Sequence, residues 1–201
     1  MGDIKCLGLS CSPRATGNTT VLLERALAGA SSAGAATELV RLADYSVSPC
    51  RACDGCFNNG LCVIKDGAGD IFDKIIKADR IILAAPIFSM GMNAQAKSLV
   101  DRSQRFWASR YILGQPVIKD PHLRPARGGI YISAAGTDLK GVFDGAIRVA
   151  RYFFKMLDIG WNGSFCYPLT DKIGDIYNNP AALEEVYRAG KRLARAGNDP
   201  S

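Results

Sequence analysis

The chain has 201 residues, 48% hydrophobic and 22% charged, which is enough for one domain with a substantial apolar core. Lysine and arginine number 25 against 19 acids, a formal net charge of +6, but these basic residues are scattered. No nucleic-acid-binding module is recognisable, so we expect no nucleic-acid partner. No apolar run is long enough to span a membrane, and the start does not resemble a secretory signal. We expect a single domain over residues 1–201, located in the cytoplasm and away from membranes.

Short strand-like runs alternate with longer helical patterns, which is typical of an α/β protein. Continuous apolar runs predict strands at residues 4–9, 37–42, 80–85, 129–134 and 159–167. Helical spacing predicts helices from residue 18, around 72–76, over 96–107, over 146–157, and from Pro180 with Asn179 as N-cap. This order fits a flavodoxin-like, doubly wound sheet of five parallel strands in the order 2-1-3-4-5. Such a sheet binds its ligand beyond the carboxyl ends of strands 1 and 3.

The first strand runs directly into a loop rich in hydroxyl, amide and guanidinium groups, Ser10–Thr19. A phosphate there would meet the N-terminal amides of the following helix and the positive end of its dipole. The loop has neither the glycine pattern of a dinucleotide site nor that of a P-loop. The alternative is an ordinary strand-to-helix turn that is rich in capping residues.

Three segments resemble the NADPH-dependent FMN reductase superfamily: Gly8–Arg14 with Gly17–Thr19, Pro86–Phe88, and Ala94–Lys97 with Asp101 and Arg102. The resemblance implies that FMN is bound by three loops. The phosphate would be held by Ser10, Ser12, Arg14, Thr16, Gly17, Asn18 and Thr19. The isoalloxazine would lie along Pro86, Ile87, Phe88 and Ser89, and its other edge would meet the backbone amides of Ser133, Ala134, Ala135 and Gly136.

Seven cysteines are present, and four of them, Cys50, Cys53, Cys56 and Cys62, fall within one short loop after the second strand. Closely repeated spacing lets thiolates from one segment converge on an iron–sulfur cluster. Zinc, uncomplexed thiols and a redox disulfide remain alternatives. Together with the FMN loops, the spacing resembles the iron–sulfur flavoprotein family, and that resemblance implies a [4Fe–4S] cluster on these four ligands. Many relatives have two adjacent acids and a methionine after this loop, where this chain has Lys65–Ala68.

The remaining candidate residues each have an ordinary interpretation. Cys6 and Cys166 are expected in the core, and Cys11 is expected to pack beside the phosphate loop. Phe88 would either stack near the flavin or pack in the core. Asp101 and Arg102 would form either a helix-surface pair or a contact with the FMN edge. His122 lies in the long connection Tyr111–Arg127, a candidate lid or subunit contact, and is expected to be solvated. The small polar tail from Ala196 is expected to fray.

These observations lead to two hypotheses for function. In the first, the protein is an FMN-dependent electron-transfer oxidoreductase that couples the flavin to the cluster and exchanges electrons with a ferredoxin-like partner. In the second, it is an NAD(P)H-dependent reductase of flavins or quinones, and the cysteine loop is structural, zinc-bound or without metal. The family resemblance also implies a homo-oligomer, either dimer or tetramer. A flavin-binding module without turnover is a third, weaker interpretation.

Overall fold

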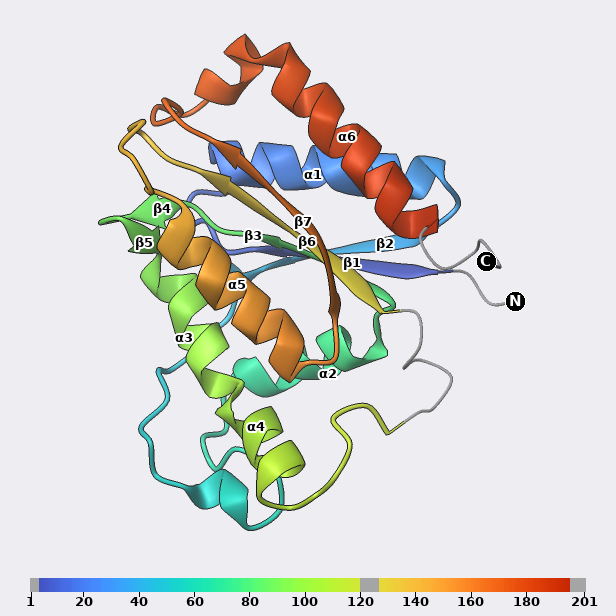
Figure 1. Cartoon of the computed structure of the whole chain (residues 1–201), viewed down its shortest axis with the longest axis vertical. Helices are drawn as coiled ribbons and strands as arrows, with labels where there is room; N and C mark the ends of the chain where they lie inside the picture. Colours follow the sequence, from blue (N-terminus) through green and yellow to red (C-terminus); the bar gives the residue numbers. More distant parts are fainter. Residues whose placement is uncertain (1–3, 120–126, 196–201) are drawn as a thin grey trace.

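A computed structural model describes residues 4–119 and 127–195 of the chain. Within these residues, five parallel strands form a sheet in the order β2-β1-β3-β6-β7 (Figure 1). The strands are β1 (Lys5–Ser10), β2 (Ala36–Arg41), β3 (Arg80–Ala84), β6 (Gly128–Ala134) and β7 (Gly160–Tyr167). Setting aside two very short strands, this is the predicted order 2-1-3-4-5, and the flavodoxin-like fold is confirmed.

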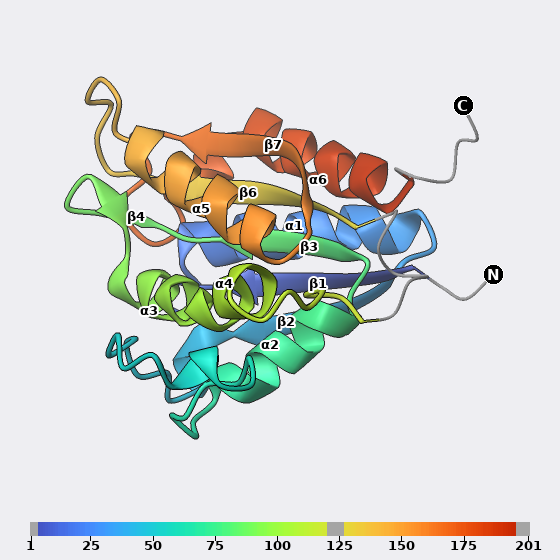
Figure 2. The same cartoon turned by 60° about the horizontal axis from the view of Figure 1, so that its bottom comes forward.

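Helices cover both faces of the sheet (Figures 1 and 2). One face carries α1 (Asn18–Ser32) and α6 (Pro180–Arg195), and the other carries α2 (Ala68–Lys77), α3 (Ala94–Arg102), α4 (Gln104–Tyr111) and α5 (Asp144–Met156). Side chains alternate between the faces along each strand. Ile81 and Leu83 pack on the α2–α5 side, whereas Ile82 packs against α1 and α6. This double burial explains why the strands are almost continuously apolar.

Helices α1 and α6 cross at a pair of glycines. A Cβ added to Gly29 would lie 2.0 Å from the carbonyl oxygen of Tyr187, and one added to Gly190 would lie 1.9 Å from that of Ala26. Both obstacles are backbone atoms, so neither can move aside as a flexible side chain could. The two helices therefore approach as closely as they do because both positions lack a side chain.

The predicted elements agree with the structure, with two exceptions. Each predicted strand of the main sheet is within one residue of the observed bounds, and the predicted N-cap is confirmed because the Asn179 side chain accepts a hydrogen bond of 3.0 Å from the Ala182 amide. The helix predicted over 96–107 is two helices, which meet at Ser103. A hairpin of two-residue strands, β4 (Ile87–Phe88) and β5 (Gly91–Met92), was not predicted.

Two expectations fall on parts of the chain that are not described, namely His122 and the tail from Ala196. Among the described helices, none combines the length and apolar character needed to cross a bilayer.

Candidate functional site

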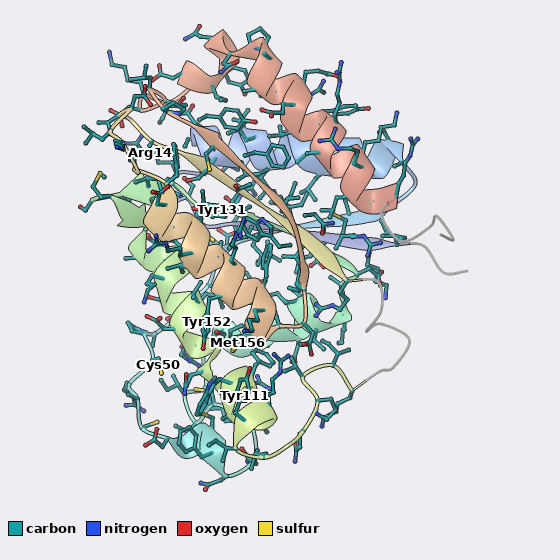
Figure 3. The ribbon with its side chains drawn as sticks, viewed as in Figure 1. Arg14, Cys50, Tyr111, Tyr131, Tyr152 and Met156 are labelled. Atoms are coloured by element: carbon teal, nitrogen blue, oxygen red, sulfur yellow. The ribbon has the colours of Figure 1, made fainter. Side chains whose placement is uncertain are left out.

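A pocket opens at the carboxyl ends of β1 and β3, where the fold predicts a ligand. It encloses about 470 Å³, including space that is open to solvent. In Figure 3, Arg14 marks this end of the sheet. The pocket is lined by Ser12, Pro13, Arg14, Gly17, Asn18, Thr19, Pro86, Ile87, Phe88, Ala134, Gly136, Thr170 and Asp171.

The amino end of α1 is open toward this pocket. Gly17 is the N-cap residue, so no side chain caps the helix, and the first turn contains no acid. The amides of Asn18 and Thr19 form no hydrogen bond with any described residue. Unpaired amides together with the positive end of the helix dipole favour an anion at this point. This geometry favours a phosphate site over an ordinary capped turn.

Gly17 also sets the width of the phosphate loop. A Cβ at this position would lie 2.6 Å from the Ser12 hydroxyl oxygen, which itself accepts a hydrogen bond of 3.1 Å from the Arg14 amide. A side chain at residue 17 would therefore displace the Ser12 hydroxyl from its place in the loop.

Five of the seven predicted phosphate-loop residues line the pocket, and two do not. The Ser10 hydroxyl is buried and lies 2.9 Å from that of Thr20, while Thr16 is exposed outside the lining. Asn18 lines the pocket, but its side chain binds other parts of the protein. It donates to the Lys172 carbonyl at 2.9 Å and accepts from the amides of Gly174 and Ile176. Asn18 thus fastens the segment after β7 onto the phosphate loop.

The β4–β5 hairpin forms a second wall of the pocket, through Pro86, Ile87 and Phe88. Phe88 is 51% exposed, which excludes the core-packing interpretation. Its turn places Ser89 and Met90 at φ of 48° and 65°, as a two-residue type I′ turn requires. Ser89 was predicted to contact the ring, but it lies at this turn and outside the lining.

The loop after β6 forms the third wall, and here only Ala134 and Gly136 of the four predicted residues line the pocket. The Ser133 hydroxyl instead donates to the Ala85 carbonyl at 2.7 Å. The Ala135 amide donates to the Tyr167 carbonyl, and its own carbonyl accepts from the Thr170 amide. Both residues hold strands and loops together.

Sequence reasoning missed three lining residues, Pro13, Thr170 and Asp171. Thr170 and Asp171 follow β7, whose carboxyl end lies at the same edge of the sheet as those of β1 and β3. That position was the available signal, because every parallel strand of a doubly wound sheet delivers its following loop to this edge. Asp171 also touches the opposite wall, since its carbonyl accepts a bond of 3.4 Å from Arg14 Nη1.

The four clustered cysteines line a second pocket, beside the junction of α3 and α4 (Figure 3, where Cys50 is labelled). Their loop turns through left-handed backbone at Ala52 and Asp54, with φ of 48° and 54°. Gly55 and Gly60 allow the loop to fold tightly. Gly60 has φ of 74°, and a Cβ on Gly55 would meet a methyl group of Val63 at 2.5 Å.

The sulfurs share this pocket without forming a ready-made coordination set. All seven cysteines are free thiols, and no three histidine, cysteine or acidic side chains of the described residues converge at metal-binding distances. Burial raises the pKa of Cys56, and the charges of Cys62, Cys50 and Cys53 add to this effect. Thiolates at these positions therefore repel one another and favour a cation between them.

Arg102 closes the cysteine loop. It is 3% exposed, which corrects the prediction of a helix-surface or flavin-edge pair with Asp101. Asp101 instead pairs with Lys97 at 2.7 Å on the surface of α3. Arg102 Nη1 donates to the Ser48 carbonyl at 3.0 Å and to the Asp66 carboxylate at 2.8 Å, while Nη2 donates to the Ile64 carbonyl at 3.1 Å. One guanidinium thus binds the chain on both sides of the four cysteines.

Two of the three isolated cysteines, Cys6 and Cys11, are core residues, whereas Cys166, which was also expected in the core, is partly exposed on β7. Cys6 and Cys11 are 1% and 0% exposed, as predicted. Burial raises the pKa of Cys6 and of Cys166 to about 12, and that of Cys11 still higher. These thiols are therefore protonated near neutral pH and are poor nucleophiles.

Comparison with known proteins agrees with this geometry. The model of the family described as NADPH-dependent FMN reductase matches residues 4–143. An iron-sulfur flavoprotein of Methanocaldococcus jannaschii is 33% identical over 198 residues, which cover 95% of this chain and 96% of the relative. An iron-sulfur flavoprotein of Methanosarcina thermophila is 39% identical over 100 residues, covering 50% of this chain and 52% of that protein.

Solved structures share the fold at low identity. A flavone reductase superposes with a TM-score of 0.73 at 18% identity, and the match covers 98% of this chain but 64% of the reductase. An NAD(P)H:quinone oxidoreductase from Methanothermobacter marburgensis superposes with a TM-score of 0.67 at 17% identity, covering 96% and 98% of the two chains. The family match, the similarity along nearly the whole chain and the fold agree. The chain therefore belongs to the iron–sulfur flavoproteins within the NADPH-dependent FMN reductase family, and it is an FMN-dependent oxidoreductase.

Proposed function

We propose that the protein is an electron-transfer oxidoreductase in which bound FMN works together with a [4Fe–4S] cluster held by Cys50, Cys53, Cys56 and Cys62. The observation that carries the proposal is that all four thiols line one pocket together with a buried arginine, Arg102. The chemistry of this donor set fits a cluster, since four thiolates are its usual ligands. Relatives named iron-sulfur flavoproteins support the same conclusion.

In this proposal the first pocket holds FMN. The phosphate binds the unpaired amides of Asn18 and Thr19, with Arg14 supplying a positive charge and Ser12 a hydroxyl group. The β4–β5 hairpin and the loop after β6 would hold the ring between them. Phe88 is exposed at this wall and is available to cover one face of the ring.

The two groups supply complementary redox chemistry when bound. Flavin exchanges electrons in pairs or singly, and an iron–sulfur cluster exchanges them one at a time. The chain's own contribution is to orient the flavin, to shield it on both faces and to set the charge and hydrogen bonding around the cysteine sulfurs. A ferredoxin-like protein is the proposed electron donor on this interpretation.

The second candidate is an NAD(P)H-dependent reductase of flavins or quinones whose cysteine loop is structural, zinc-bound or without metal. It is favoured by the family match over residues 4–143 and by the fact that the described thiols are not preassembled at metal-binding distances. Anaerobic mixing with NADPH separates the two candidates. Rapid bleaching of the flavin absorbance supports the second, and bleaching only by reduced ferredoxin supports the first.

The decisive experiment is anaerobic purification followed by analysis of iron, labile sulfide and FMN, with electron paramagnetic resonance after reduction. We expect about four irons and four sulfides per chain, as in a cubane cluster. A Cys53→Ser variant should lose iron and keep flavin, and a Cys6→Ser variant should keep both. A colourless protein that contains one zinc would refute the cluster, and equal loss of iron and flavin in Cys53→Ser would show that the sites are not separable.

We also propose that the protein forms a homo-oligomer, either dimer or tetramer, in the cytoplasm. Large apolar side chains are exposed beside both pockets, among them Leu61, Tyr111 and Ile112 near the cysteines and Leu169 and Tyr177 near the flavin pocket. Contiguous exposed apolar residues favour association. Light scattering during size-exclusion chromatography would reveal the mass, and a monomer at micromolar concentration would refute this proposal.

A further inference from the structure

The guanidinium of Arg102 has hydrogen-bonding capacity that its structural contacts do not use. A guanidinium has five N–H groups. Two of them, on Nη1, bind Ser48 and Asp66, and one on Nη2 binds Ile64. The Nε–H is buried and meets no acceptor at hydrogen-bonding geometry among the described residues. An unpaired buried N–H costs about 1–3 kcal/mol, so its retention calls for an explanation.

The guanidinium of Arg102 lies beside the cysteines. Arg102 and Cys62 together line the cysteine pocket, and they also line the adjoining hollow on the other side of the loop. Asp66, Ser48 and Ile64 fix the guanidinium, so it cannot turn away from the sulfur.

We propose that Arg102 donates an N–H···S hydrogen bond to the Cys62 ligand of the cluster and thereby raises the cluster's reduction potential. This inference rests on the proposed function, because it needs a cluster on the four cysteines. Reduction adds one negative charge to the cluster. A fixed, buried cation stabilises the reduced form more than the oxidised form, and hydrogen bonds to the sulfurs act in the same direction.

Arg105 is a second arginine of this pocket and differs in what it binds. Its Nε donates to the Gly60 carbonyl at 3.2 Å, so this N–H is used by the backbone. The Nε–H of Arg105 is therefore paired, whereas the Nε–H of Arg102 is buried and unpaired. Comparing the two arginines tests whether this buried donor adds to the effect of a nearby positive charge.

The test is an anaerobic redox titration of the holoprotein, followed by electron paramagnetic resonance, for Arg102→Gln, Arg102→Lys and Arg105→Gln. We expect Arg102→Gln to disfavour cluster reduction at least tenfold, which corresponds to 59 mV for a one-electron couple. Arg102→Lys keeps the positive charge but loses the planar guanidinium, so the shift in the cluster potential should be smaller but measurable. Arg105→Gln should shift the potential less than Arg102→Gln does. The flavin potential of each variant is the internal reference, and Arg188→Gln, at an exposed pair with Glu184, is the control.

Loss of iron from the variants would point to a structural role, so a second measurement uses the metal-free protein. Alkylation of Cys62 and Cys50 is followed by mass spectrometry in wild type and in Arg102→Gln. If Arg102 lies against the Cys62 sulfur, the variant should slow alkylation of Cys62 several-fold relative to that of Cys50. Equal changes at both cysteines would overturn the inference, as would a wild-type potential and spectrum in an iron-replete Arg102→Gln protein. Wild-type protein without iron and sulfide would instead refute the proposed function.

Discussion

A buried ion pair between Asp66 and Arg102 organises the cysteine pocket. The Asp66 side chain is 9% exposed and that of Arg102 is 2% exposed. Burial would raise the pKa of Asp66, but hydrogen bonds from Arg102 and from the amides of Ser48 and Ala68 outweigh it and hold the pKa below its ordinary value. The carboxylate is therefore ionised in the folded protein and compensates the arginine charge.

Replacing Asp66 with asparagine should destabilise the protein by about 3 kcal/mol at pH 7, because it leaves the buried Arg102 charge without its partner. A carboxylate whose pKa is lowered on folding contributes stability that is present above its unfolded pKa of about 3.9 and is lost as the pH falls through the folded value. The difference between wild type and Asp66→Asn in urea unfolding should therefore shrink below about pH 4.

The matched control is Asp101→Asn, which breaks the exposed pair with Lys97 on α3. An exposed ion pair contributes about 0.5 kcal/mol, so this variant should unfold almost as wild type does. Equal losses for the two variants would contradict the buried role assigned to Asp66.

Replacing Gly17 should weaken FMN binding with little effect on the stability of the fold. Its φ of −67° suits any residue, so Gly17→Ala introduces no backbone strain, but its Cβ would displace the Ser12 hydroxyl. We expect FMN affinity to fall about tenfold, or about 1.4 kcal/mol, with little change in unfolding. Fluorescence titration with FMN measures the affinity, and affinity equal to that of wild type would show that the loop accommodates the methyl group.

At the scale of the elements, the close packing of α1 against α6 depends on the glycines at their crossing, Gly29 and Gly190. We expect Gly29→Ala and Gly190→Ala each to destabilise the fold by about 3 kcal/mol, because the added carbon meets a carbonyl and the helices must separate. Thermal unfolding followed by circular dichroism measures the loss.

Gly69 provides the control, because it lies in α2 and an added Cβ would meet nothing within 4 Å. Gly69→Ala should stabilise the protein by about 0.5–1 kcal/mol, through helix propensity alone. If Gly69→Ala destabilised the protein as much as the two variants at the crossing, alanine would be unfavourable at any helical glycine of this protein. The close approach of α1 and α6 would then not explain the loss of stability.

Helix ends are also closed by buried arginines in a way that the sequence does not reveal. Arg127 Nε donates to the Ala78 carbonyl at 3.0 Å, just after α2, and Nη1 donates to the Leu157 carbonyl, just after α5. Arg80 Nε donates to the Leu193 carbonyl in the last turn of α6 at 2.7 Å. Burial lowers the pKa of Arg127 to about 10, so the side chain remains charged at neutral pH. These contacts satisfy carbonyls that a helix end leaves without partners.

The five strands and most helices were predictable because each has its own local apolar pattern. The break between α3 and α4 at Ser103 was not predictable. Leu99 in α3 and Phe106 in α4 pack on the same core, so the apolar spacing continues across the junction. The β4–β5 hairpin has two residues per strand, too few to show an alternation of apolar and polar side chains. Its turn residues are Ser89 and Met90, so the asparagine and glycine that usually mark such a turn are absent.

At the sites, the sequence indicated which loops meet but not what each side chain does there. The position of the phosphate loop follows from strand order alone. The use of Asn18 to fasten residues 172–176, and of Ser133 to hold Ala85, depends on neighbours distant in sequence. The burial of Arg102 was likewise hidden, because a charged residue on a helix is ordinarily exposed.

At the scale of the whole molecule, FMN binding should stabilise the fold, because the proposed flavin pocket is lined by segments that are far apart in the sequence. Adding FMN to the apoprotein at 100 times its dissociation constant should raise the free energy of unfolding by about 2.7 kcal/mol. Riboflavin, which lacks the phosphate, should give a much smaller increase at the same concentration. Urea unfolding with each compound tests this, and equal stabilisation by both would argue against an anion site at the amino end of α1.

The hydrogen bond from Asn18 to Lys172 joins residues 154 positions apart, so the pocket can form only after residue 172 has been synthesised. Ribosomes add roughly 5–20 residues per second, so roughly 8–30 s pass between the synthesis of the two partners. During that interval the phosphate loop exists without the segment that holds it. Stable binding of the cofactor therefore requires synthesis of the segment after β7, and a chain that stopped before this segment would retain its flavin poorly.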